Sequence, residues 1–157
     1  MKEFRIAEEK DLNQLAQMRY EYWLEDGHEN AERDKGNFIK KCEAFLREGL
    51  ITKQWTYWIA IINGEIVSNI FVQRVIKVPK PSKLNDTFGY VTNVYTKPLY
   101  RDQGIGANLL INVQKWAKDQ DLEFLISWPS EDSIRFYQRA GFLSTEAMEY
   151  SVRPYVN

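Results

Sequence analysis

The sequence predicts a mixed α/β fold in which helices cover both faces of one β-sheet. Antiparallel strands come first, because two β-rich runs at 55–62 and 65–76 are joined by Asn63-Gly64, which suits the positive φ values of a type I′ turn. Strand–helix–strand units follow, in which apolar helical stripes alternate with short strand-like runs. The predicted order of elements is βααβββαβαβ.

The N-terminal half is predicted to contain a strand at 3–7, helices at 11–24 and about 35–48, and the hairpin. Arg19 interrupts the apolar face of the first helix, and we expect its aliphatic stem to lie at the edge of the core. Cys42 shares an apolar stripe of the second helix with Phe38 and Leu46, which predicts a buried, inert thiol. The first helix places these apolar residues on one face: Leu12, Leu15, Ala16, Tyr22 and Trp23.

The C-terminal half begins with a proline-containing loop at 77–86 and a strand at 88–96. The following helix, at about 104–119, carries one apolar face. A short apolar strand is predicted at 122–128, and a helix at 130–140 that ends at Gly141 in the left-handed conformation of a helix terminus. A strand at 142–152 completes the order.

Composition excludes several classes of protein. The 157 residues suit one domain over 1–157, and a net charge of −1 predicts neither a nucleic-acid nor a membrane partner. A single cysteine and a single histidine predict no internal disulfide and no metal site. His28 lies in a polar turn and is interpreted as solvated. Without an apolar membrane span or a secretory signal, a cytoplasmic location is expected.

The strand at 88–96 leads into a glycine-rich turn that precedes a helix. Gly104 and Gly106 would let several unpaired N–H groups of the helix start face one anion, and Arg101 could add a charge-assisted contact to a phosphate. Two interpretations of this segment stay open, an anion cradle and a turn that uses glycine for geometry alone. No Gly-Lys pair allows a P-loop, and Leu109 stands where a dinucleotide fingerprint has a small residue.

This segment, VYTKPLYRDQGIG at 94–106, resembles motif A of the GNAT N-acetyltransferase superfamily, in which a strand leads into Arg/Gln-x-x-Gly-x-Gly/Ala and a helix. A second segment, SIRFYQRAGF at 133–142, resembles motif B of the same family. The order of elements also agrees along nearly the whole chain. The resemblance implies a mixed sheet with splayed central strands, and acetyl-CoA as cosubstrate.

The resemblance also implies roles for the matching positions. Backbone groups of Val94, Tyr95 and Thr96 would pair with the pantetheine arm, and the Val94 amide would donate to the thioester oxyanion. Tyr137 would protonate, or donate a hydrogen bond to, the leaving thiolate. The turn amides that would cradle the pyrophosphate belong to Arg101, Asp102, Gln103, Gly104, Ile105, Gly106 and Ala107.

The sequence departs from the family pattern in three places. Ser130 and Ser133 replace the usual Asn and Ala of motif B; both are assigned to the cofactor site, and Ser130 also suits a helix N-cap. A catalytic Glu on the strand before the turn is missing, since Thr92 and Asn93 stand there. The general base therefore stays open among water and three carboxylates: Glu25, Asp26 and Glu131.

The predicted activity is acetyl transfer from acetyl-CoA to an amine, directly in a ternary complex. The acceptor, a small molecule or a peptide, is expected between the first two helices and the hairpin, near Tyr22, Trp23 and Asn93. The alternative is a non-catalytic acyl-CoA-binding sensor or scaffold. The sequence does not identify the acceptor, and the family makes a homodimer plausible. The aromatic residues of this region suit a pocket wall or, more often, plain core: Tyr20, Tyr22, Trp23, Trp55, Tyr57 and Trp58.

Overall fold

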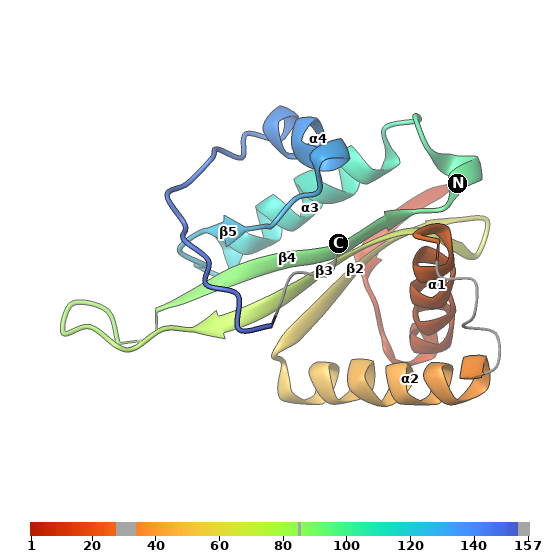
Figure 1. The fold of residues 1–157 in the computed structure, drawn as a ribbon, viewed down its shortest axis with the longest axis horizontal. Coiled ribbons are helices and arrows are strands. Elements are labelled where there is room, and N and C mark those ends of the chain that lie inside the picture. Colours follow the sequence, from red (N-terminus) through yellow and green to blue (C-terminus); the bar gives the residue numbers. More distant parts are fainter. Residues whose placement is uncertain (28–33, 85, 154–157) are drawn as a thin grey trace.

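The sheet has five strands in the order β1-β2-β3-β4-β5 (Figure 1), in a computed structural model that describes residues 1–27, 34–84 and 86–153. His28 lies outside the described residues. Adjacent strands from β1 to β4 are antiparallel, and β5 is parallel to β4. The predicted mixed sheet is therefore confirmed. The strands are β1 (Lys2–Ile6), β2 (Trp55–Ile62), β3 (Glu65–Ile76), β4 (Thr87–Thr96) and β5 (Leu125–Ile126).

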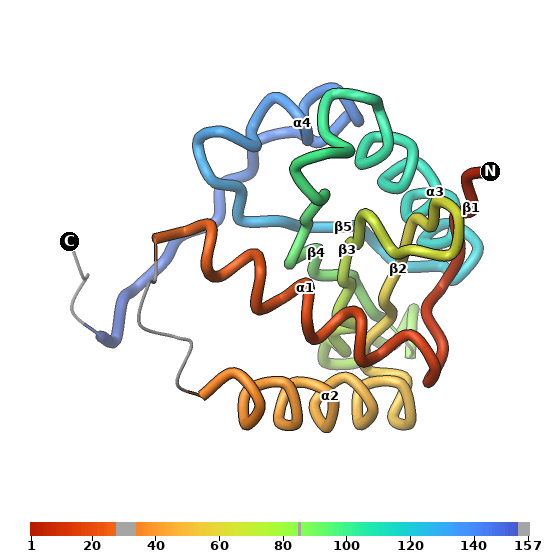
Figure 2. The backbone as a smooth tube through the Cα atoms, turned by 90° about the vertical axis from the view of Figure 1, so that its right-hand side faces the viewer, coloured from red at the N-terminus to blue at the C-terminus, as the bar shows by residue number. Residues whose placement is uncertain are grey.

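Helices cover both faces of the sheet (Figures 1 and 2). The pair α1 (Leu12–Glu25) and α2 (Lys35–Thr52) packs on one face, while α3 (Ile105–Asp119) and α4 (Ile134–Arg139) lie on the other. Each side has its own cluster of buried apolar residues, because every strand between them presents alternate side chains to the two faces. Among the described residues, no helix has the length and apolar character needed to cross a membrane.

Local turn signals act as the sequence predicts. Asn63 and Gly64 have φ values of 50° and 82°, as a type I′ hairpin turn requires. Gly141 ends the α4 region with a φ of 91°. The hairpin strands match their predicted bounds, and the predicted helices differ by a few residues at their ends.

Two strand predictions need correction. The strand expected at 122–128 is reduced to Leu125–Ile126. The strand expected at 142–152 does not form, although the structure describes every residue of that segment. The segment has the alternating pattern of a strand, but Met148, Tyr150 and Val152 are at least 89% exposed. A strand needs a neighbour with free backbone groups in register, and a two-residue β5 offers too short an edge. The helix expected at 130–140 begins as a 3₁₀ turn, Glu131–Ser133, before α4.

Most of the aromatic residues considered for a pocket belong to the core. Tyr20 and Tyr57 are buried, and Trp55 and Trp58 pack against the two apolar clusters. Tyr22 is half-buried, whereas Trp23 is 39% exposed.

The predicted buried thiol on α2 is only half-buried. Cys42 packs against the apolar cluster beneath α1 and α2. Burial raises the pKa of its thiol, so the group stays protonated at neutral pH. This protonation is consistent with the inert role that the sequence predicts.

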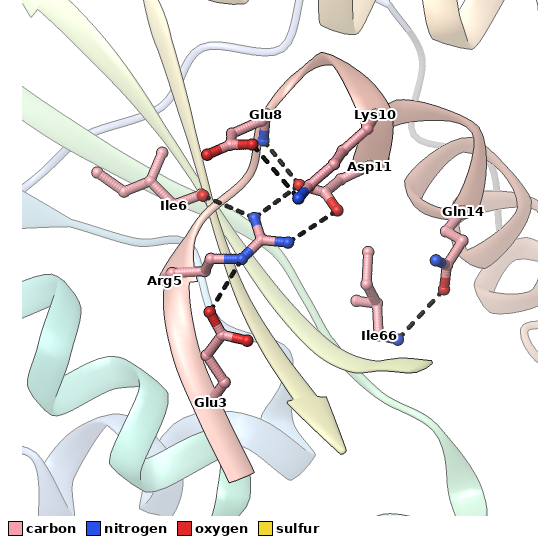
Figure 3. Close-up of polar contacts among 8 residues, drawn as sticks. All are labelled: Glu3, Arg5, Ile6, Glu8, Lys10, Asp11, Gln14 and Ile66. Atoms are coloured by element: carbon pink, nitrogen blue, oxygen red, sulfur yellow. Dashed lines mark hydrogen bonds and ion pairs between the residues drawn. The ribbon is translucent and has the colours of Figure 1, made fainter. Parts of the chain in front are cut away.

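An ion pair fixes the direction in which the chain leaves β1 and enters α1 (Figure 3). Arg5 Nη1 lies 2.7 Å from Asp11 Oδ2, and Arg5 Nη2 lies 3.1 Å from Oδ1. The same carboxylate accepts a hydrogen bond from the Glu8 amide at 2.8 Å. Asp11 is only 5% exposed, so its charge is stabilised mainly by these contacts. One turn later, Gln14 accepts a hydrogen bond from the Ile66 amide and joins α1 to β3.

Candidate functional site

The candidate site is a cleft where β4 and β5 diverge. Only two residue pairs, Gly89–Leu125 and Tyr90–Ile126, join these strands, so β4 has no strand partner on that edge from Val91 onward among the described residues. A cavity of about 730 Å³ opens here, and the start of α3 and residues of α4 also line it. A parallel pair of strands that separates in this way leaves backbone hydrogen-bonding groups free for a ligand.

A bulge in β4 sets which side chains face the cleft. Asn93 has a φ of 51°, and the β3–β4 register shifts beside it. The extra residue changes the alternation of side chains along β4. As a result, Val91 and Val94 both pack on the α3 side although they are three positions apart. The bulge is fixed by Asn69, a residue only 1% exposed, whose Nδ2 donates to the Asn93 carbonyl at 2.7 Å.

Two backbone amides beyond the bulge face the open edge of β4. The Lys97 amide donates to Val67 of β3, and the Tyr95 carbonyl accepts from Ser68 of β3. Since N–H groups alternate between the two edges of a strand, the amides of Val94 and Thr96 face away from β3 and toward the cleft. These are two of the residues that the sequence assigns to the cofactor.

The glycine-rich turn forms one end of the cleft. Gly104 has a φ of 76° and immediately precedes the first residue of α3. The first amides of a helix have no intrahelical acceptor, so those of Ile105, Gly106 and Ala107 lie at the positive end of the helix dipole. A Cβ on Gly106 would lie 3.4 Å from Thr96 Oγ1 and 3.5 Å from the Phe136 ring. These short distances show that the start of α3 lies close to β4 and α4.

Arg101 is engaged differently from the sequence prediction. Its Nη2 lies 2.8 Å from Glu25 Oε2 and its Nε donates to the Thr96 carbonyl at 2.9 Å, so the guanidinium ties the end of α1 to β4 instead of standing free for a phosphate. The Tyr95 hydroxyl donates to the other oxygen of Glu25 at 2.5 Å. Burial raises the pKa of Glu25, but the hydrogen bonds from Tyr95 and Arg101 outweigh it and hold the pKa below its ordinary value. This carboxylate, one of the candidates for the base, is thus already paired.

Tyr137 of α4 lies in the same cleft and is only 7% exposed. Its ring packs edge-on against Phe136 and Phe142, which fixes its direction. Burial raises the pKa of the hydroxyl, against an opposing hydrogen bond with Ser127. The hydroxyl is therefore protonated at neutral pH and able to donate a proton or a hydrogen bond.

Most sequence-predicted residues come together in this cleft; the exceptions are Gln103 and Trp23. Gln103 instead donates a hydrogen bond to the Leu99 carbonyl. Ser130 and Ser133 line the cleft, but the Ser130 hydroxyl donates to Ser133 Oγ and not to a backbone amide, so it does not cap the helix in the expected way.

Asp26 and Glu131, also considered as bases, are not part of the cleft lining. The sequence analysis did not predict several residues that line the cleft. The available signal was their position near the end of a strand at the edge of the sheet. They are Tyr90, Val91, Tyr100, Ser127, Trp128, Pro129, Asp132, Phe136 and Arg139.

Comparison with known proteins gives a family and a fold. The model of the acetyltransferase (GNAT) family matches residues 12–142. A predicted acetyltransferase from Clostridium acetobutylicum, solved with acetyl-CoA, is 24% identical with a TM-score of 0.79, over 97% of each chain. A GCN5-related N-acetyltransferase from Ralstonia eutropha is 22% identical with a TM-score of 0.77, over 97% of this chain and 99% of that one.

A ribosomal-protein-alanine N-acetyltransferase from Brucella melitensis has 16% identity and a TM-score of 0.74, over 96% of this chain and 99% of that one. At these identities the solved structures establish a shared fold and nothing finer. A comparison with curated proteins found no match.

Proposed function

The chain belongs to the acetyltransferase (GNAT) family, and from this premise we propose that it transfers an acetyl group from acetyl-CoA to the nitrogen of an amine. One observation carries the proposal. The free edge of β4, the helix start behind Gly104 and the Tyr137 hydroxyl all border one cleft. These are the three groups that a thioester cosubstrate needs: donors for its arm, donors for its phosphates and a proton source for its thiolate.

Each part of the cosubstrate has a matching part of the cleft. The pyrophosphate lies against the amides of Ile105, Gly106 and Ala107, where the helix dipole favours negative charge. The pantetheine arm pairs with β4 at Val94 and Thr96 in place of a further strand. The acetyl-CoA in the solved Clostridium acetobutylicum protein supports this choice of cosubstrate.

The reaction is direct transfer with no covalent enzyme intermediate. The amine nitrogen attacks the thioester carbon, and the Val94 amide donates a hydrogen bond to the oxygen as it becomes negative. The C–N bond forms, the C–S bond breaks, the thiolate takes a proton from Tyr137, and the water of the cleft returns a proton to the Tyr137 phenolate. The amine gives up its own proton to water, because Glu25 is held by Arg101 and Tyr95.

The test begins with a calorimetric titration of the purified protein with acetyl-CoA. We expect a Kd near the micromolar range, about −8 kcal/mol. A panel of amines is then screened as acceptors by measuring the release of the CoA thiol. Initial rates at varied concentrations of both substrates should give intersecting double-reciprocal lines. Parallel lines would contradict direct transfer, and no binding at millimolar concentration would overturn the whole proposal. Tight binding without turnover of any amine would favour the non-catalytic module instead.

Replacement of Tyr137 by Phe tests the proton donor, because it removes the hydroxyl and keeps the packed ring. General-acid assistance is worth about 100-fold or more, so kcat should fall by at least that factor. The Kd for acetyl-CoA should stay within twofold of the wild type, about 0.4 kcal/mol. A kcat equal to that of the wild type with a good acceptor would remove Tyr137 from the mechanism.

A further inference from the structure

Arg19, beside the cleft, has no ion pair with any carboxylate of the residues that the structure describes. Ion pairs among the described residues include Arg5, Arg47 and Arg101, but none includes Arg19. Arg19 Nη1 donates to Asn93 Oδ1 at 3.0 Å, across 74 residues of sequence. Its stem does not simply rest at the core edge, as the sequence suggests, but directs the charge from α1 to the bulge of β4.

The position of the guanidinium is set by rings as well as by the hydrogen bond. Arg19 lies over the Tyr22 ring, 5.5 Å from its centroid, and Tyr22 stacks on Tyr95 at 5.0 Å. Asn93 is fixed in turn by the bulge and by the bond from Asn69 to its carbonyl. A long exposed side chain held in this way loses less freedom when it binds a ligand than a free one does.

Among the described residues of α1, neither Glu25 nor Glu21 pairs with this charge. Glu25 is paired with Arg101 and bonded to Tyr95. Glu21, two positions after Arg19 on α1, adds to burial and Glu25 in raising the pKa of Tyr95, but residues at that spacing do not face each other on a helix. The remaining N–H groups of Arg19 and the Nδ2 group of Asn93 make no hydrogen bond with any residue that the structure describes. Together they form a set of donors that suits a carboxylate.

This set of donors lies next to the reacting atoms of the proposed transfer. Asn93 directly precedes Val94, whose amide faces the cleft, and consecutive Cα atoms are about 3.8 Å apart. We infer that Arg19 and Asn93 bind a carboxylate of the acceptor, so that the acceptor is an amine that carries a carboxylate close by, as a free amino acid does. The inference rests on the proposed function, because it names the acceptor class of that same cleft. A short link between the two groups lets the amine reach the thioester while the carboxylate is held.

The test compares matched acceptors that differ only in the carboxylate. Phenylalanine is paired with phenethylamine, lysine with cadaverine and alanine with ethylamine, and kcat/KM for thiol release is measured at one pH. The wild type should prefer the carboxylate form of at least one pair by roughly 10- to 100-fold, as a charged hydrogen bond allows. Arg19→Gln should abolish this preference and leave the rate with the decarboxylated amine unchanged. Arg19→Lys should keep part of the preference, because it keeps the charge and loses the bidentate geometry.

Two further variants make the result specific. Asn93→Asp keeps the size of the side chain and pairs with Arg19, so it should also abolish the preference, even where Arg19→Gln folds poorly. Arg74→Gln removes an exposed arginine that bonds Gln120, away from the cleft lining, and should behave as the wild type.

The outcomes separate this inference from the proposed function. Equal rates for the acceptors of every pair, in an enzyme that acetylates them, would overturn the carboxylate site and leave the transferase intact. An equal fall in both rates for Arg19→Gln would also overturn it, since the arginine would then only hold the bulge. If acetyl-CoA binds and no amine of either kind reacts, the carboxylate site and amine transfer both fall. If acetyl-CoA itself does not bind, the cosubstrate assignment falls with them.

Discussion

Gly104→Val is the sharpest test of the phosphate cradle, because the same change can be made elsewhere at the same structural cost. Gly104 has a φ of 76°, and a Cβ built there meets no atom within 4 Å. Gly64, in the β2–β3 turn, has a φ of 82° and equally open surroundings, yet it is not part of the cleft lining. Gly64→Val is therefore a matched control for backbone strain alone.

The expected magnitudes follow from this geometry. A left-handed backbone costs a residue with a Cβ about 1–2 kcal/mol, and at neither site does the Cβ meet another atom within 4 Å. Both variants should therefore melt roughly 2–8 °C below the wild type, at about 2–4 °C per kcal/mol for a chain of this size. Relief of the strain at Gly104 also turns the first α3 amides away from the anion. One lost charge-assisted hydrogen bond is worth about 1.5–3 kcal/mol, so the Kd for acetyl-CoA should rise roughly 10- to 150-fold.

The assay is calorimetric titration of both variants with acetyl-CoA, with thermal unfolding measured alongside. Gly64→Val should bind as the wild type does although it is less stable. If Gly104→Val keeps wild-type affinity while it loses stability, the turn serves helix geometry alone and the cradle is wrong. If both variants lose affinity equally, the loss reports general destabilisation and not a contact at the turn.

Two other predictions concern carboxylates that the fold pairs. Asp11→Asn removes the buried carboxylate partner of Arg5 at the β1–α1 junction and leaves it, among the described residues, only the exposed Glu3, so the free energy of unfolding should fall by about 3 kcal/mol, as measured in urea. Burial raises the pKa of Asp11, but the hydrogen bonds from Arg5 and the Glu8 amide and the charges of Arg5 and Lys10 together hold it below its ordinary value. The stabilisation is therefore complete above the ordinary pKa and disappears as the pH falls through the lowered folded-state pKa. An acid titration of stability should show this loss in the wild type and not in Asp11→Asn. Glu25→Gln should keep kcat within about threefold of the wild type, because a true general base would contribute 100-fold or more. A fall of that size, with loss of the acidic limb of the pH–rate profile, would make Glu25 the base after all.

Features that depend on neighbours in sequence could be predicted with good accuracy. Asn63-Gly64 forms the hairpin turn because two adjacent residues that tolerate positive φ are sufficient for it. The apolar stripe of α3 and the turn at Gly104 are also local, and they predict the end of the cleft that is assigned to the phosphates. The family resemblance placed Tyr137 and the free edge of β4 in that same cleft.

Features that depend on distant residues could not be predicted from the pattern. The segment at 142–152 alternates like a strand, but a strand forms only where a neighbour presents a matching edge, and β5 is two residues long. The bulge at Asn93 changes the alternation of β4, and it is held by Asn69 from another strand. A periodic pattern contains no information on such a one-residue shift.

The sequence by itself therefore determined the order of the elements, the hairpin and the glycine turn, because each follows from backbone preferences within a few residues. Only the tertiary structure decided how the charges of the cleft are paired. Arg101 meets Glu25 across 76 residues, and Arg19 meets Asn93 across 74. Partners this far apart are brought together by the packing of α1 against the sheet, and the energy of a charge depends on which partner it meets there.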